Sequence, residues 1–239
     1  QLQNSQAAPH AEPAAQGALL SLAGRDGTAA GLNLRFGSAA GADQGANDAG
    51  DFDLAGFARV DINADTVLGL ADHGLDVDAA LFQITSGVIG SSAGRTLAIS
   101  TGGELRTFNR AGFDAAPLAS SLLGGRVSLT GSSVSHAGTV LAPGGSIELR
   151  STGGDVSISG VINAAGISGL DFGVTTLGTP GGRVRLAAGG GDLNIGATAD
   201  IDVSGGLGEQ AGSGGDLRLE AADGVLNVAA GARLRATAD

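Results

Sequence analysis

Apolar and polar residues alternate along much of this chain, and the clearest alternation follows pairs of glycines. One phrase, consisting of two glycines and then polar and apolar residues in turn up to a leucine, occurs four times in the second half. A period of two predicts β-strands with one buried face, because an amphipathic helix would space apolar residues three and four positions apart. The four copies are Gly124–Leu129, Gly144–Leu149, Gly181–Leu186 and Gly214–Leu219.

The spacing of this phrase predicts a repeat architecture. Its second glycines fall at positions 125, 145, 182 and 215, so one short step precedes two longer steps. Periods of about 20 to 50 residues are typical of solenoids. Two further short alternating runs follow each copy, and three strands per turn describe a parallel β-helix. We therefore expect an all-β, right-handed parallel β-helix with second strands at 133–135, 154–158, 191–195 and 224–228, and third strands at 139–141, 161–164, 200–203 and 233–236.

The alternation also predicts which side chains stack in successive repeats. Glu148 is expected near Arg185, Arg185 beside Arg218, and Asn194 over Asn227 in an amide ladder of the kind that in-register strands form. The glycines suit tight corners, where positive φ is needed and a Cβ would clash. The apolar residues expected to face inward are Val127, Leu129, Ile147, Leu149, Val184, Leu186, Leu217 and Leu219.

The pattern divides the chain into three parts. Residues 1–16 are rich in Ala, Gln and Pro and are expected to form a linker or entry segment. Residues 17–123 are expected to form irregular β-helix repeats, and residues 124–239 regular repeats with Gly-Gly corners, roughly ten turns in all. The chain has no initiator methionine and no polar cap after its last repeat, so we expect a segment of a longer protein.

Several stretches interrupt the predicted strands. Residues 37–50 read as an acidic loop, and Phe108–Leu123 as a longer loop or a one-turn helix that closes an edge. The long repeats exceed the shortest repeat by two Gly-rich stretches, Gly166–Thr179 and Gly205–Ser213. We expect both stretches to leave the coil at one corner, because insertions in solenoids collect on one face, which is often the binding face.

The amino-acid composition mainly excludes certain partners and kinds of site. The 239-residue chain has a net charge of −11, which argues against nucleic acids and anionic membranes as partners. All 13 basic residues are arginine, and a Walker phosphate loop requires a lysine. No apolar run is long enough for membrane insertion, and residues 1–16 lack the features of a signal peptide. The absence of cysteine excludes disulfides and thiol chemistry, and it suits export in unfolded form.

One stretch matches a catalytic motif. Gly90–Gly94 has the nucleophile-elbow pattern, and Asp114 and His136 follow in the order of a catalytic triad. The elbow needs a strand, a turn and a helix in an α/β sheet, which this pattern does not predict. His10 is placed in the linker, while His73 and His136 are placed in turns, and no metal-ligand spacing connects the three histidines.

Two groups of carboxylates were weighed as sites. Asp43, Asp48, Asp51 and Asp53 could offer oxygen ligands to calcium, but the spacing of the known calcium loops is missing, which favours a solvated loop. A second group is expected at stacked corners, where carboxylates would suit polysaccharide cleavage but more often bond the backbone. This second group consists of Asp155, Asp192 and Asp202.

The repeated phrase, the Gly-Asp-Val/Leu-x-Ile runs at 154–158 and 191–195, and Ile201–Gly205 resemble the β-helical shaft of filamentous-haemagglutinin-like large exoproteins. These are the secreted partners of bacterial two-partner secretion systems. The likeness is good over 124–239 and loose over 18–123. The secretion domain of that family carries Asn-Pro-Asn motifs, and this chain has no Asn-Pro pair, which places it in the shaft. The resemblance implies an extracellular or cell-surface location, export through an outer-membrane secretion pore, and a host or neighbouring cell surface, carbohydrate included, as partner.

Architecture and resemblance together predict a segment of a secreted bacterial surface adhesin or extracellular fibre, a stiff shaft used in cell adhesion or cell–cell contact. We predict no enzyme, no cofactor, and no catalytic, cofactor-binding or metal-binding residue. Two alternatives stay open. A β-helical polysaccharide lyase or hydrolase would need a cleft lined by several carboxylates. A structural filament protein would assemble end to end through exposed strand edges.

Overall fold

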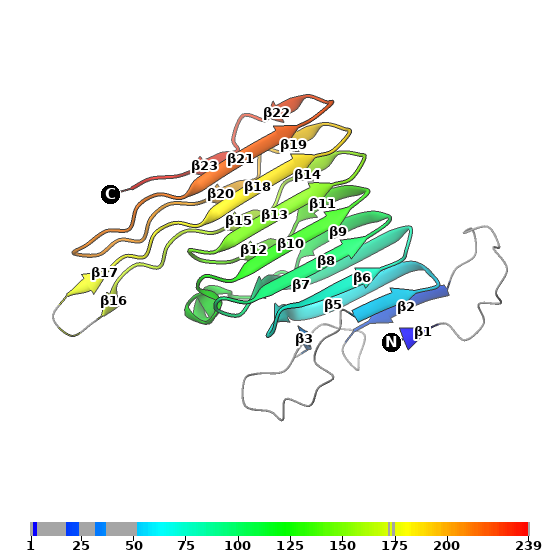
Figure 1. Ribbon diagram of the computed structural model, residues 1–239, viewed down its shortest axis with the longest axis horizontal. Helices are drawn as coiled ribbons and strands as arrows, with labels where there is room; N and C mark the ends of the chain where they lie inside the picture. Colours follow the sequence, from blue (N-terminus) through cyan, green and yellow to red (C-terminus); the bar gives the residue numbers. More distant parts are fainter. Residues whose placement is uncertain are drawn as a thin grey trace.

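The computed structural model describes residues 2–3, 18–23, 32–36, 52–171, 173 and 175–238. Within these ranges the protein is mostly β-strand, and the strands of its two long sheets pair in parallel (Figure 1). The prediction of an all-β protein with parallel strands is therefore confirmed. Apart from one two-residue strand, the predicted linker at 1–16 lies outside the described residues, as does the predicted loop at 37–50.

Strands that are one repeat apart in the sequence lie side by side, and they form three ladders. Among the described residues, the first ladder is an eight-stranded sheet. Val127 pairs with Ile147, Ile147 with Val184, and Val184 with Leu217, so equivalent positions of the glycine phrase are neighbours. The strands of this ladder are β1 (Leu2–Gln3), β4 (Phe52–Ala55), β6 (His73–Val77), β8 (Thr96–Thr101), β10 (Arg126–Gly131), β13 (Ser146–Ser151), β18 (Arg183–Ala188) and β21 (Asp216–Ala221).

The other two ladders are joined through the two longest strands. β5 (Phe57–Gly69) and β7 (Leu81–Ser91) belong to both ladders, because each continues through a corner that the sequence pattern divides into two strands. The second ladder also contains β2 (Ala18–Leu22), β9 (Glu104–Asn109), β11 (Ser133–Ala137), β14 (Val156–Ile158), β19 (Leu193–Ile195) and β22 (Leu226–Val228). The third ladder also contains β3 (Asn33–Phe36), β12 (Thr139–Leu141), β15 (Val161–Asn163), β20 (Asp200–Asp202) and β23 (Arg233–Arg235).

Apolar side chains from all three ladders meet in one core. The expected inward residues of β10, β13 and β18 are at most 2% exposed, and they alternate with exposed or half-buried residues in β10 and β13. Leu217 and Leu219 of β21 pack against the same core and are half-buried. Each fully buried Val, Leu or Ile side chain contributes about 1.5–3 kcal/mol. The predicted inward register is therefore confirmed.

Close stacking of the backbone explains most of the glycine pairs. A Cβ at Gly145, Gly182 or Gly215 would lie 2.0, 2.1 or 1.9 Å from the carbonyl oxygen of the equivalent glycine in the preceding repeat. Among the four phrases, φ is positive at only two first glycines, 72° at Gly124 and 59° at Gly144. The expectation of positive φ at every such corner is therefore wrong, and the expectation of a Cβ clash is confirmed.

The interruption expected near Phe108–Leu123 contains a 3₁₀-helix, η2 (Ala116–Leu122). Residues 96–125, all of them described, contribute no strand to the third ladder, and β12 pairs directly with β7. Leu122 packs in a small second core with Leu68, Val88 and Leu141 of the third-ladder strands. The helix therefore covers these strands. The expectation that it closes an edge is wrong. No helix in the described part of the chain has the length and apolar character to cross a membrane.

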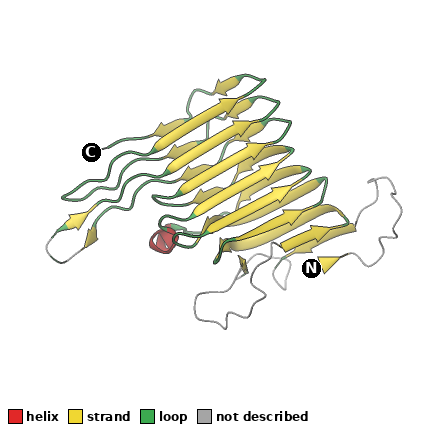
Figure 2. Ribbon diagram, in the orientation of Figure 1, coloured by secondary structure: helices red, strands yellow, loops and turns green. Residues whose placement is uncertain are grey.

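The two predicted loops lie at one corner, between the third and first ladders, and they stack on each other (Figure 2). We call this projection, residues 166–179 and 205–213, the arm. Its layers are bonded together, since the Gly178 N–H donates to the Gln210 carbonyl at 2.8 Å. The first layer also contains a short antiparallel pair, β16 (Leu170–Asp171) and β17 (Thr176–Leu177).

Candidate binding surface

The outer side of the first ladder carries a cluster of arginines. Alternate residues of β10, β13, β18 and β21 point away from the core, and five of the 13 arginines occupy these positions beside only three carboxylates. In Figure 1 these strands lie at the front, with no other element over them. The cluster contrasts with the net charge of −11. We name it the arginine face, and its charged members are Arg126, Glu148, Arg150, Arg183, Arg185, Asp216, Arg218 and Glu220.

Two of these carboxylates are held by a chain of ion pairs. Arg185 contacts Glu148 and Glu220 at 2.7 Å each, and Arg218 also contacts Glu220. The pairing of Glu148 with Arg185 and the position of Arg185 beside Arg218 are as predicted. The sequence analysis missed Glu220, which lies between the two guanidinium groups and offsets their repulsion. The hydrogen bond from Arg185 holds the pKa of the Glu220 carboxyl below its usual value.

The remaining arginines of the face are held weakly or not at all. Arg126 and Arg150 are exposed, and neither has an ion-pair partner among the described residues. Arg183 contacts Asp216 at 3.2 Å, with the two side chains 71% and 73% exposed. An ion pair this exposed contributes little, because water screens the attraction and ordering both side chains costs entropy. Three guanidinium groups are therefore available to an anionic partner.

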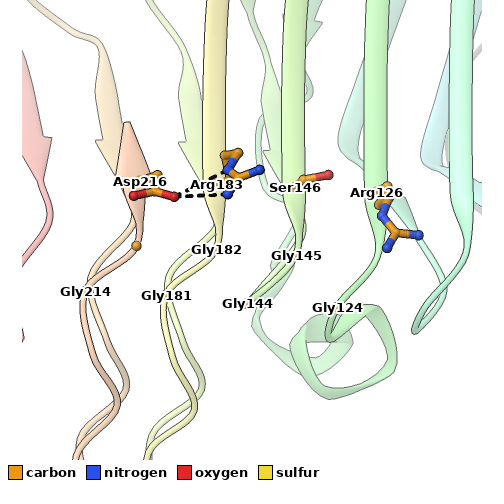
Figure 3. Close-up of a pocket in the computed structure, with 11 residues that line it drawn as sticks. Gly124, Arg126, Gly144, Gly145, Ser146, Gly181, Gly182, Arg183, Gly214 and Asp216 are labelled. Atoms are coloured by element: carbon orange, nitrogen blue, oxygen red, sulfur yellow. Dashed lines mark hydrogen bonds and ion pairs between the residues drawn. The ribbon is translucent and has the colours of Figure 1, made fainter. Parts of the chain in front are cut away.

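A groove runs along one edge of the arginine face, over the glycine corners of four repeats (Figure 3). Its floor is glycine backbone, because the stacking leaves no room for side chains at Gly145 and Gly182. Arg126, Ser146, Arg183 and Asp216 follow one another along its side, each from the start of a neighbouring strand, so a carboxylate ends the row. The groove is a shallow, open depression of about 440 Å³.

The carboxylates considered for catalysis bond to the backbone or to arginine. Asp155 Oδ1 accepts a hydrogen bond from the Asp192 N–H, and Asp192 Oδ1 accepts one from the Val225 N–H, both at 2.8 Å. Asp202 lies 3.0 Å from Arg235. The corner role expected of Asp155 and Asp192 is confirmed, and each of them ties its own repeat to the next one.

The three candidate triad residues, Ser92, Asp114 and His136, lie in separate parts of the structure. Ser92 follows β7, whereas the Asp114 carboxylate accepts a hydrogen bond from the backbone N–H at the start of η2. His136 is fully buried in β11. Gly90, the first glycine of the motif, is explained by packing, because a Cβ there would lie 2.8 Å from the Leu122 side chain.

His136 is bonded through both ring nitrogens. Nδ1 lies 2.6 Å from Thr107 Oγ1, and Nε2 lies 3.2 Å from the Val161 carbonyl oxygen. A carbonyl only accepts, so Nε2–H donates to it and Nδ1 accepts the threonine hydroxyl. Burial lowers the pKa of His136 to about 4, so the ring is neutral at pH 7. The prediction that His73 and His136 lie in turns is wrong, since both are buried strand residues.

The structure tests only part of the suspected metal ligands. Asp53 is an exposed residue of β4, while His10, Asp43, Asp48 and Asp51 lie outside the described residues. Where the chain is described, no three His, Asp or Glu side chains converge to hold a metal ion.

The arginine face was not predicted from the sequence. Its signal was present, because Arg126 and Arg183 occupy the same position of the repeated phrase and Arg185 and Arg218 share another. Comparisons of the chain with protein-family models, curated proteins and solved structures find no match.

Proposed function

We propose that the chain is a right-handed parallel β-helix that forms the stiff shaft of a secreted bacterial surface adhesin or extracellular fibre. The observation that carries the proposal is the register of the ladders. Equivalent residues pair across repeats of unequal length. A coil that advances by one strand per repeat accounts for this register, with the surplus residues of the long repeats placed in the arm.

Bonds between neighbouring repeats support the stiffness that a shaft needs. The Asn227 amide donates to Asn194 Oδ1 at 2.9 Å, which is the ladder predicted from the sequence. Arg235 contacts Asp200 of the preceding repeat at 2.7 Å. With the corner aspartates, these contacts join successive repeats at several points around the coil. Bending the rod would have to break several of them together.

The resemblance to filamentous-haemagglutinin-like exoproteins supports the location and the partner. That likeness implies a shaft outside the cell after export through an outer-membrane pore. A chain without cysteine suits this route, because no disulfide can form before export is complete. The mechanism is mechanical: the shaft holds the arginine face and the arm away from the cell that makes it, where they meet a host or neighbouring cell.

Immunogold electron microscopy of intact producing cells tests this function. Antibodies against residues 124–239 are expected to label thin fibres outside the cell, while antibodies against a cytoplasmic protein leave intact cells unlabelled. Deleting this segment from the native protein is expected to reduce attachment to other cells. Label that appears only after permeabilisation, together with unchanged attachment, would contradict the proposal. Cleavage of a polysaccharide by the purified protein would instead favour the lyase or hydrolase alternative.

A further inference from the structure

We infer that the arginine face binds an extended acidic polysaccharide, a sugar chain that carries carboxylate or sulfate groups. This inference gives the proposed adhesin a class of ligand. It rests on the proposed function only in assuming that the protein meets the polymer at a cell surface. The binding itself is argued from the charges, spacing and hydrogen-bonding groups of the surface.

The exposed guanidinium groups of Arg126, Arg150 and Arg183 suit an anionic partner. An arginine side chain presents a planar fork of N–H donors that matches the oxygens of a carboxylate or sulfate group. Arg126 and Arg150 are exposed without a carboxylate partner in the described structure, and Arg183 has only its exposed contact with Asp216. The local excess of arginine offers an anion an attraction that the net charge of the whole chain does not.

The spacing of these groups requires a ligand longer than a single small ion. Arg126 and Arg183 are two strands apart, which is about 10 Å between their backbones. Arg150 lies on the strand next to Arg126, four residues further along, so about 14 Å separates these two backbones. Three positive groups at such separations match a polymer with charges at intervals, lying across the strands.

The surface between the arginines favours a sugar chain over a nucleic acid. Ser128, Thr130 and Ser146 place half-buried hydroxyl groups between the arginines, and glycine backbone forms the groove floor. Such a floor lets a hydroxylated ring approach closely. Single-stranded nucleic acids are usually held by aromatic side chains that stack on the bases, and no outward residue of these four strands is aromatic. Duplex DNA carries a charge about every 1.7 Å, a much denser row than three guanidinium groups about 10 to 14 Å apart can match.

Binding of defined polymers to the purified 239-residue chain tests the inference. The probes are dextran sulfate, polygalacturonate, single-stranded DNA and uncharged dextran, measured by biolayer interferometry at low and physiological salt. Both anionic polysaccharides are expected to bind, with affinity falling as salt rises, and dextran is expected not to bind. The stronger of the two anionic polysaccharides distinguishes a sulfated from a carboxylated ligand. Absence of binding to both anionic polysaccharides, or tighter binding to single-stranded DNA, would overturn the inference.

A pair of matched variants locates the binding. Arg126→Ser with Arg150→Ser is expected to weaken binding by about tenfold or more and to lower its salt dependence. The control, Arg35→Ser with Arg233→Ser, removes the same charge from exposed residues of the third ladder and is expected to change affinity by about twofold at most. Equal losses in both pairs would overturn the inference in favour of a general charge effect. Unfolding temperatures close to that of the parent chain would show that both variants fold. If neither anionic polysaccharide binds, the inference fails, but the surface-labelling experiment still tests the proposed function independently.

Discussion

Gly182 shows how one missing side chain sets the distance between two repeats. The N–H of the next residue, Arg183, donates to the Gly145 carbonyl at 2.8 Å, which draws the two backbones together at the corner. A Cβ on Gly182 would lie 2.1 Å from that same oxygen. Glycine is therefore needed here for space, and a similar approach recurs at Gly145 and Gly215. The sequence identified these corners, but it could not separate a need for space from a need for positive φ.

Replacing Gly182 by alanine should destabilise the fold, because the added methyl group forces the paired strands apart. We expect a loss of about 3 kcal/mol or more in the free energy of unfolding, measured by urea denaturation. Gly153→Ala is the matched control, since a Cβ there meets nothing within 4 Å. The control is expected to be neutral or to stabilise by up to about 1 kcal/mol, because alanine restricts the unfolded chain. Equal losses in both variants would contradict the proposed close approach.

The buried ring of His136 should make stability depend on pH. Its pKa is about 4 in the folded protein, while an exposed histidine has its pKa near 6.5. Between these values the unfolded chain binds the extra proton, so stability is full above pH 6.5 and falls as pH decreases towards 4. The loss from this residue amounts to about 3 kcal/mol and ends once both states are protonated.

Urea denaturation between pH 7 and pH 4 measures this effect. Since carboxylates also titrate near the lower end, the comparison is with His136→Gln, which keeps a donor and an acceptor but does not titrate in this range. The variant is expected to lose less stability over the interval than the parent chain. Identical pH profiles would show that the buried ring does not control the dependence.

Among the strands and loops, the regular half of the fold was predictable from sequence. The period of two and the glycine pairs located β10, β13, β18 and β21 with their inward residues. In the first half, the sequence shows the apolar runs, but β5 and β7 carry no glycine pair at the bend. Their pairing skips only Asp65 and Gly87 and then resumes in the same register. Nothing in the local pattern separates a bent strand from two strands joined by a corner.

Two features could not be predicted from the sequence: that η2 takes the place of a third-ladder strand, and that the outward arginines form one face. Both depend on which residues of different repeats lie next to each other. Leu122 packs against Leu68 of β5 and Val88 of β7, which belong to earlier repeats of the chain. The arginine face combines residues from repeats of unequal length, so it emerges only once their register is known. The local pattern allowed each outward arginine to be treated as an isolated solvated charge.

Replacing Leu186 by aspartate tests the inward register of a central strand. The side chain is fully buried in β18, so an unpaired carboxylate there should cost about 4 kcal/mol or more and disrupt the neighbouring repeats. Thr130→Asp is the control, because Thr130 faces outward beside Arg150 and can accept a charge. Thermal unfolding should show a large loss for the first variant and a small change for the second. Unchanged unfolding of the Leu186 variant would contradict the register.

At the scale of the whole molecule, an acidic chain with two long parallel sheets presents one arginine-rich side. Two of the four glycine pairs along the groove, Gly181–Gly182 and Gly214–Gly215, follow the two layers of the arm in the sequence, so the arm and the arginine face meet at one corner. Charges elsewhere act on a ligand here only over short distances, because the Debye length is about 8 Å at physiological ionic strength. A local excess of arginine can therefore attract an anionic polymer on a chain with a net charge of −11.

The central claim is that the chain coils with one layer for each repeat, and a row of outward residues in the second ladder makes this measurable. An unbroken register links these residues strand by strand. Because the chain contains no cysteine, cysteines introduced in pairs can be spin-labelled selectively. The row consists of Gln83, Arg106, Ser135, Ser157, Asn194 and Asn227.

Pulsed electron paramagnetic resonance on labelled pairs would measure distances from Gln83 along this row. Strand spacing predicts about 14 Å to Ser157, about 19 Å to Asn194 and about 24 Å to Asn227. The steps should be equal even though longer stretches of chain separate the last three positions than the earlier ones. Equal steps of about 5 Å are the result that a coil with one layer per repeat predicts. Unequal steps, or distances that follow separation along the chain, would contradict it.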